Sequence, residues 1–405
     1  MRRVAITGVG IISALGANRS QFWQALAAGR SGIGPIQSVD RTLLTFANGA
    51  EVQGFRPEDH FPARTLDMLD RFAQLGVVAA REAVADAGID LTPELKERSA
   101  VITGTTVGGQ GSNQRVFDDL YLAKKRRPAV LTIPRIMPNA AACHISMEFG
   151  LSGPVYTVST ACAASTHAIG QAFDLVRSGR ADLAVTGGSD TPFSFGYLKG
   201  WEVMRVVAPD TCRPFSKGRQ GMILGEGGAV FVLEPLEAAR ARGARIHAEV
   251  AGFGMTADAH HLTAPSVEGP ARAMQQAIAD GGIRPEQVNY VNAHGTGTVV
   301  NDATEARALL QVFGPHLRKL PVSSTKSMHG HGLGAGGAIE AVATVLALKE
   351  GVLPPTANFT EADPECDLDV IPNQARPAAA EYALSNSFAF GGLNAVLLFR
   401  RGDRQ

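Results

Sequence analysis

The chain has 405 residues, 45% of them hydrophobic, which allows two core-forming units or one large duplicated unit. Its formal net charge is zero, which excludes a general electrostatic attraction to nucleic acid or to an anionic membrane. The four cysteines form no Cys-x-x-Cys pair, so neither a disulfide framework nor a zinc site is predicted. No run approaches the ~20 apolar residues of a membrane span, and we expect a cytoplasmic protein.

In the first part of the chain, predicted strands and helices alternate. The first strand, at residues 3–7, leads into Gly8-Val9-Gly10, which we interpret as a turn. This is not a dinucleotide-binding fingerprint, because Ser13 stands where the third glycine would be. Further strands are predicted at 100–103, 183–186, 227–233 and in the run from 155 toward Cys162, and helices at 22–28, 70–86, 134–147, 163–176 and 235–242.

The same alternation continues in the second part of the chain. Strands are predicted at 248–253, 288–292 and 322–324, helices at 268–280, 301–313 and 338–349, and two strands joined by Gly391-Gly392 within 383–399. Alternation of this kind indicates an α/β protein. The junction near residues 240–250 has no Pro/Ser linker, so we expect two closely packed halves, residues 1–243 and 244–405.

Cys162 lies between a predicted buried strand and a predicted helix. The sharp turn places it at the N-terminus of the helix among small residues, where a substrate has close access. The helix dipole favours a thiolate there by roughly 0.3–1 kcal/mol. A small buried core cysteine is the alternative interpretation.

Two histidine motifs follow strands in the second part of the chain. His294 stands before a Gly-Thr-Gly-Thr loop, and His331 stands in a Gly-rich loop after Lys326. Each histidine alone is compatible with a structural role, and zinc binding by His329 and His331 has only a weak signal. Together with Cys162, each lies at the carboxyl end of a strand, where open α/β sheets form their sites.

One cysteine and two histidines favour thioester chemistry through a carbanion. An activated thiolate forms a covalent acyl-cysteine, and two imidazoles supply donors to the oxygen of an enolate. A cysteine protease would use one histidine with an Asn or Asp, and would need neither the second histidine nor Lys326.

Four motifs stand in order along the chain: Thr160-Ala161-Cys162, Asn292-Ala293-His294-Gly295-Thr296, Lys326-Ser327-Met328-x-Gly330-His331 and Asn386-Ser387-Phe388-x-Phe390-Gly391-Gly392-x-Asn394. In this combination the chain resembles the β-ketoacyl-acyl-carrier-protein synthases, and it is most similar to the elongating type II enzymes. The resemblance implies a thiolase-like fold with five layers, α-β-α-β-α, built from two similar halves in a dimer.

The resemblance also implies a decarboxylative Claisen condensation, in fatty acid or polyketide elongation. Cys162 would carry the acyl chain, and His294 and His331 would stabilise the enolate made from a malonyl thioester. The backbone N–H groups of Cys162 and Phe390 would form the oxyanion hole. Lys326, paired with Glu305, would order the histidine loops.

Further residues acquire roles from the same resemblance. Thr296 and Thr298 would line the phosphopantetheine tunnel, and Phe390 would also gate the acyl pocket. Phe388 would contribute to substrate binding, and Val107 would lie along the acyl pocket, contributed across the dimer. No metal, nucleotide or free cofactor is implied, because the acyl carrier protein brings both substrates on phosphopantetheine.

Departures from the fatty-acid pattern leave alternatives open. Ala389 and Leu393 stand where the fatty-acid enzymes usually have Gly and Thr. Gly297 and Asn301-Asp302 resemble polyketide- and nodulation-type synthases, so a heterodimer with a chain-length factor stands beside the homodimer. A non-catalytic partner and a degradative thiolase are further alternatives, but Cys366 is a poor second cysteine for a thiolase. The basic run 124–127 is either a solvated loop or a docking patch for an acidic carrier.

Overall fold

The computed structural model describes residues 1–402, so the last three residues of the predicted second half lie outside it. Within residues 1–402, ten strands form one continuous mixed sheet in the order β10-β9-β13-β14-β8-β1-β7-β6-β4-β5. The first half supplies β1 (Val4–Ser13), β4 (Ser99–Gly104), β5 (Val155–Val158), β6 (Leu183–Asp190) and β7 (Gly227–Pro235). The second supplies β8 (Ala248–Ala257), β9 (Tyr290–Asn292), β10 (Val322–Ser323), β13 (Tyr382–Ala389) and β14 (Leu393–Arg401).

The two halves repeat one topology. Numbered by appearance within its own half, each five-stranded region has the order 3-2-4-5-1. In both, strands 2, 3 and 4 are parallel to one another, while strand 5 is antiparallel to strands 4 and 1. The regions join where β1 pairs with β8 over three residues. The boundary at residue 243 stays a prediction.

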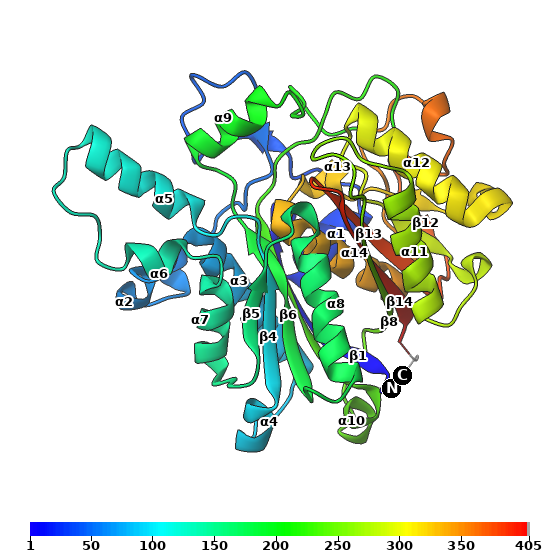
Figure 1. Cartoon of the computed structure of the whole chain (residues 1–405), viewed down its shortest axis with the longest axis horizontal. Coiled ribbons are helices and arrows are strands. Elements are labelled where there is room, and N and C mark those ends of the chain that lie inside the picture. The colour runs from blue at the N-terminus through cyan, green and yellow to red at the C-terminus, as the bar shows by residue number, and fades with distance from the viewer. Residues whose placement is uncertain (403–405) are drawn as a thin grey trace.

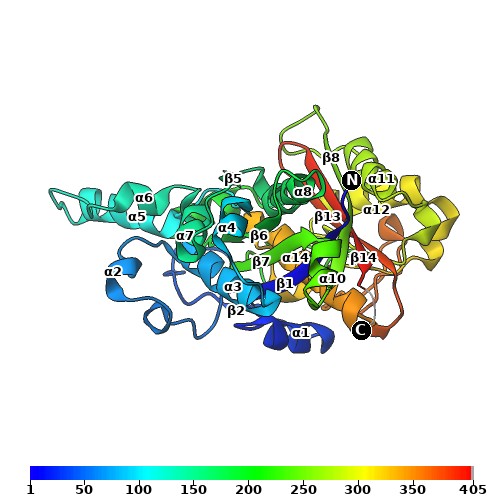
Figure 2. The same cartoon turned by 90° about the horizontal axis from the view of Figure 1, so that it is seen from below.

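Helices complete the five layers of the described chain (Figures 1 and 2). The central layer is α8 (Ala164–Arg177) and α14 (Gly336–Glu350), which contact each other and strands of both halves. One outer layer is α3 (Arg71–Ala87) and α7 (Ala140–Phe149), packed on the first half. The other is α11 (Glu268–Asp280) and α12 (Val299–Phe313), packed on the second. The predicted thiolase-like α/β architecture is present.

The burial of these helices follows from their layer. The outer helix α3 buries one face; the Asp70 side chain caps its start, and Gly88, in the left-handed conformation, ends it. In contrast, residues 336–348 of α14 are all buried, because the helix packs against strands of both five-stranded regions of the sheet.

Shorter elements connect the layers. In the first half these are α1 (Arg19–Ala27), β2 (Gly34–Pro35), β3 (Asn48–Gly49), η1 (Pro57–Asp59), α2 (Ala63–Leu66), α4 (Pro93–Glu97), α5 (Gln110–Phe117), η2 (Asp118–Leu122), α6 (Thr132–Ile136), η3 (Ala161–Ala163), α9 (Phe195–Val203) and α10 (Leu236–Ala241). In the second half they are η4 (Pro285–Gln287), η5 (Gly314–Lys319), α13 (Lys326–His329), η6 (Leu333–Ala335), β11 (Val352–Leu353), η7 (Pro364–Cys366) and β12 (Arg376–Pro377). None of the helices in the described range could cross a bilayer.

Three local predictions were wrong. Residues 8–10 continue β1 instead of turning, and their glycines serve helix packing: a Cβ at Gly8 or Gly10 would lie 2.0 Å from a backbone oxygen of α3. The predicted helix 134–147 is split into α6 and α7, because the residue before Pro138 is extended. The predicted buried strand β5 is an edge strand whose Tyr156 is 37% exposed.

Candidate active site

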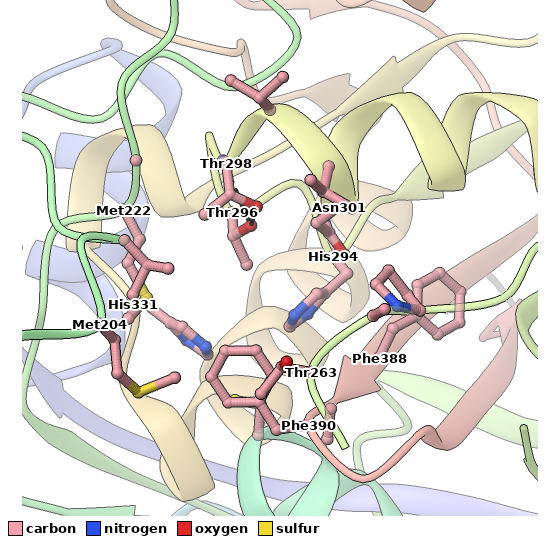
Figure 3. A pocket seen from close by; sticks show the side chains of 18 of the residues that line it. Met204, Met222, Thr263, His294, Thr296, Thr298, Asn301, His331, Phe388 and Phe390 are labelled. Carbon is pink, nitrogen blue, oxygen red and sulfur yellow. Dashed lines mark hydrogen bonds between the residues drawn. The ribbon is translucent and has the colours of Figure 1, made fainter. Parts of the chain in front are cut away.

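A cavity of about 450 Å³ lies where the two halves meet. Cys162 lines it from the first half, and His294 and His331 line it from the second. Figure 3 shows both imidazoles pointing into the same space, with Phe390 opposite them. The three residues that sequence analysis selected are therefore brought together.

Cys162 lies in η3, between the end of β5 and the start of α8, as predicted. Ala161, just before it, has a φ of +49°, which few residues other than glycine adopt. Close packing beneath holds this corner: a Cβ at Gly104 would lie 2.3 Å from the Ser165 nitrogen. The corner therefore presents the thiol at the N-terminal end of α8.

Electrostatics at Cys162 differ from the predicted thiolate. Burial raises the pKa of the Cys162 thiol to about 12, although the nearby Lys326 charge acts in the opposite direction. The dipole contribution of about 0.3–1 kcal/mol is too small to offset that desolvation. Burial thus favours the neutral thiol over the thiolate at this position.

The protonation of His294 is fixed by its neighbour. The Lys326 ammonium has only donors, and its Nζ lies 3.3 Å from Nδ1 of His294. Nδ1 is therefore the acceptor, and the proton of the neutral ring sits on Nε2. Burial and the Lys326 charge hold the pKa of His294 well below its usual range, so the ring is neutral near pH 7.

His331 has the same tautomer for a different reason. The backbone N–H of Leu333 donates to its Nδ1 over 3.3 Å, which again leaves the proton on Nε2. Burial also holds the pKa of His331 well below its usual range. The two ring centroids are 5.4 Å apart at an angle of 83°. The cavity thus contains two neutral N–H donors, set close enough for one carbonyl oxygen to accept from both.

Lys326 does not pair with Glu305, contrary to the prediction. Its Nζ makes a buried ion pair with Glu340 of α14, whereas Glu305 accepts from the backbone N–H groups of His294 and Gly295, at 2.8 and 2.7 Å. Burial raises the pKa of Glu305 to about 7. Glu305 thus orders the His294 loop through the backbone, while Glu340 holds the lysine that fixes the His294 tautomer.

Two protein-family models match the chain, one in each half. The family model "Beta-ketoacyl synthase, N-terminal domain" matches residues 1–239, and "Beta-ketoacyl synthase, C-terminal domain" matches residues 247–360. The chain belongs to the beta-ketoacyl synthase family. The predicted resemblance and the acyltransferase class are thereby confirmed.

Two relatives match over nearly the whole chain. Nodulation protein E of Rhizobium sp. (strain N33) is 50% identical over 404 residues, 99% of each chain. 3-Oxoacyl-(acyl-carrier-protein) synthase 2 of Staphylococcus aureus (strain COL) is 41% identical, covering 99% of this chain and 98% of the relative. The structure of the ishigamide ketosynthase/chain length factor aligns with a TM-score of 0.94 at 39% identity, over 99% of this chain and 100% of that chain.

In this beta-ketoacyl synthase the other predicted substrate residues mostly line the cavity. Thr296, Thr298, Phe388 and Phe390 all do so. Phe388 meets the His294 ring edge-on, with centroids 6.0 Å apart. The backbone N–H of Phe390 makes no hydrogen bond within residues 1–402, which leaves it free for an oxyanion. Val107 is the exception: it is 36% exposed and does not line the cavity of its own chain, so a role across a dimer stays a prediction.

The structure adds residues that the sequence analysis missed. Trp201 of α9 lines the cavity and stacks on Phe390, with ring centroids 6.0 Å apart and planes inclined by 22°. Thr263, from the loop after β8, reaches the same space (Figure 3). Trp201 and Thr263 reach the cavity because of the course of their loops in space, so no pattern of neighbouring residues could have predicted them. Glu340 could have been predicted as a functional residue, because a lone carboxylate in an apolar helix needs a charged or hydrogen-bonding partner.

The zinc alternative and the thiolase alternative both lose support. Both ring nitrogens of His329 form hydrogen bonds, to Gly330 O and Thr325 Oγ1 at 2.8 and 2.9 Å. Among the described residues, no cluster of His, Cys, Asp or Glu could hold a metal ion. Cys366 lies in η7 and does not line the cavity.

Proposed function

We propose that this protein catalyses decarboxylative condensation of a malonyl thioester with an acyl group on Cys162, as an elongating β-ketoacyl-acyl-carrier-protein synthase. The observation that carries the proposal is one cavity with a thiol and two neutral imidazoles, each presenting Nε2–H. Both substrates would be carried on the phosphopantetheine arm of an acyl carrier protein, without a free cofactor, in the cytoplasm.

The first half-reaction is acyl transfer. The sulfur of Cys162 attacks the acyl thioester carbonyl, and the carrier's C–S bond breaks as the new C–S bond forms. The thiol proton leaves with the departing carrier thiol. The backbone N–H groups of Cys162 and Phe390 would stabilise the oxyanion.

The second half-reaction forms the carbon–carbon bond. The malonyl thioester oxygen accepts from Nε2–H of His294 and His331, so charge that develops during loss of CO2 is stabilised as an enolate. The enolate carbon attacks the acyl carbonyl, the C–S bond to Cys162 breaks, and the released thiolate takes a proton from solvent. Thr296 and Thr298 would hold the arm of the carrier during this step.

The test is an assay of both half-reactions. Purified protein with acyl- and malonyl-loaded carriers should release one CO2 for each β-ketoacyl product. Mass spectrometry should locate the acyl group on Cys162 in the absence of malonyl carrier. A wild-type protein that acylates no cysteine and releases no CO2 would contradict the proposal and would favour a non-catalytic partner.

A specialised pathway is a second candidate. Its support is the 50% identity to a nodulation protein E and the structural likeness to a ketosynthase/chain length factor. In that case the chain would work as a heterodimer with a chain-length factor. Sedimentation of the purified chain together with its activity distinguishes the two, because an active homodimer contradicts the heterodimer.

A further inference from the structure

A second cavity lies at the far end of α14 from the active site. Its volume is about 620 Å³, and four segments form its wall: residues 245–247 before β8, 348–351 at the end of α14, 377–379 after β12 and 401–402 at the end of β14. The first residue of α14, Gly336, lies beside the His331 ring, whereas its last turn lines this cavity. Roughly 20 Å of helix therefore separates the cavity from the active site.

Positive side chains dominate the wall of this second cavity. Arg245, Lys349 and Arg401 all line it, and Glu350 is the one carboxylate among the described lining residues. Arg401 lies 3.5 Å from Glu381, which takes up part of its charge. Within residues 1–402, neither Arg245 nor Lys349 has a carboxylate oxygen within 4.0 Å. Two of the three cations are therefore left without an ion-pair partner in the described part of the chain.

Lys349 is held in place by His247, which also lines the cavity. The ammonium group has only donors, and Nζ of Lys349 lies 3.3 Å from Nδ1 of His247, so Nδ1 accepts. The ring proton is then on Nε2, which donates to Asp86 over 2.7 Å. The same oxygen of Asp86 also pairs with Arg19. The neutral imidazole thus positions the lysine without neutralising its charge.

The positive charges around Lys349 repel one another. Burial lowers the pKa of Lys349, and the charges of Arg19 and Arg245 lower it further, while Glu350 and Asp86 offset only part of this effect. A group that lies among like charges gains when an opposite charge approaches. An anion in the cavity would therefore be stabilised by the charges already gathered there.

The size and lining of the cavity indicate which kind of anion fits. A single phosphate group would fill only a small part of about 620 Å³, and three cations suit an anion with more than one charge. Arginine binds phosphate oxygens through two parallel N–H groups, and lysine binds them as a point charge. The rest of the wall is apolar, so an organic group can pack beside the anion; it contains Ile246, Leu348, Pro377 and Ala378.

We propose that this cavity is a binding site for a diphosphate group, either as inorganic diphosphate or as part of a nucleotide, with Arg245, Lys349 and Arg401 as its contacts. The proposal is independent of the reaction at Cys162. Because the site is formed only in the folded chain, its ligand should also stabilise the native state.

The experiment is calorimetric titration of the full-length protein in a buffer of low ionic strength, with inorganic diphosphate in one arm and ADP in the other. We expect one site per chain. In Arg245→Gln/Lys349→Gln, Kd should rise by at least about tenfold, because both unpartnered cations are lost. Arg318→Gln/Lys319→Gln is the matched control, since it removes two exposed positive charges from η5, outside the cavity. Its Kd should stay within about twofold of the wild-type value.

A third variant should change the affinity in the opposite direction. Glu350→Gln removes the one carboxylate of the described wall and should tighten the binding of inorganic diphosphate by about threefold. Tighter binding of ADP than of diphosphate supports a nucleotide site, and equal or weaker binding of ADP supports a site for inorganic diphosphate. A wild-type protein that binds neither probe, or equal losses in the cavity variant and the control, would overturn the proposal.

Discussion

The two halves of the molecule share one strand order but carry different chemistry. At the corner from third strand to helix, the first half places Cys162 and the second places Lys326 and His331. Both corners lie at the carboxyl ends of parallel strands, and so they face one cavity. The repeated topology thus provides two equivalent positions, which carry a thiol in the first half and an imidazole in the second.

The segments that follow the second strand of each half, β4 and β9, also carry different side chains. After β9 the chain presents His294 to the cavity, whereas after β4 the side chains of Thr105 and Thr106 donate to the buried carboxylate of Asp190. Asp190 also accepts from Gly334 N, close to His331. This position in the first half therefore braces the histidine loop of the second half.

The connection between the fourth and fifth strands also differs between the halves. In the second half this is the short turn at Phe390, while in the first half residues 191–226 form a long excursion with α9. The excursion brings Trp201 onto Phe390. This part of the cavity wall is therefore assembled from equivalent connections of both halves.

Removal of the Cys162 thiol should show most clearly that the two halves carry different activities. Cys162→Ala should lower condensation by at least about 10³-fold, because no acyl-enzyme forms. Release of CO2 from malonyl carrier should persist, since the second half retains both imidazoles. Product analysis and CO2 measurement check the two activities; an unchanged condensation rate would refute the assignment of Cys162.

The converse variant affects the second half alone. His331→Ala removes one of two donors to the enolate oxygen and should slow CO2 release by about 10²–10³-fold. Acylation of Cys162, followed by intact-protein mass spectrometry, should continue. If the acyl-enzyme also failed to form in a folded variant, the division between the halves would be wrong.

The buried ion pair between Lys326 and Glu340 should stabilise the second half, and its removal measures that contribution. Glu340→Gln leaves Lys326 without a carboxylate partner and should lower the free energy of unfolding by about 3 kcal/mol. Denaturant titration measures the change. In Lys326→Met/Glu340→Leu most of that stability should return, whereas CO2 release should fall below that of the wild-type protein because Nδ1 of His294 has lost its donor.

The smallest effect concerns the pH dependence of Cys162. With a pKa near 12 the thiol loses its proton in a growing fraction as pH rises, so alkylation by iodoacetamide should accelerate by about tenfold per pH unit from 7 to 9. A rate that levels off near pH 7 would show instead that the N-terminus of α8 outweighs burial.

Residue patterns along the chain were enough to predict the alternation of elements, the corner at Cys162 and the set of one cysteine and two histidines. These signals are local, because period, helix caps and turn residues lie within a few positions of one another. Gly8 and Gly10 were wrongly predicted to form a turn. Glycine is required there because α3 packs closely across the strand.

Tertiary structure alone decided the partners. Glu340 rather than Glu305 pairs with Lys326, Trp201 lines the cavity beside Phe390, and burial raises the pKa of the Cys162 thiol. Each of these outcomes depends on which side chains converge from distant segments and on how much water they exclude. Neither quantity is encoded by neighbours along the chain, so only the packed halves could fix them.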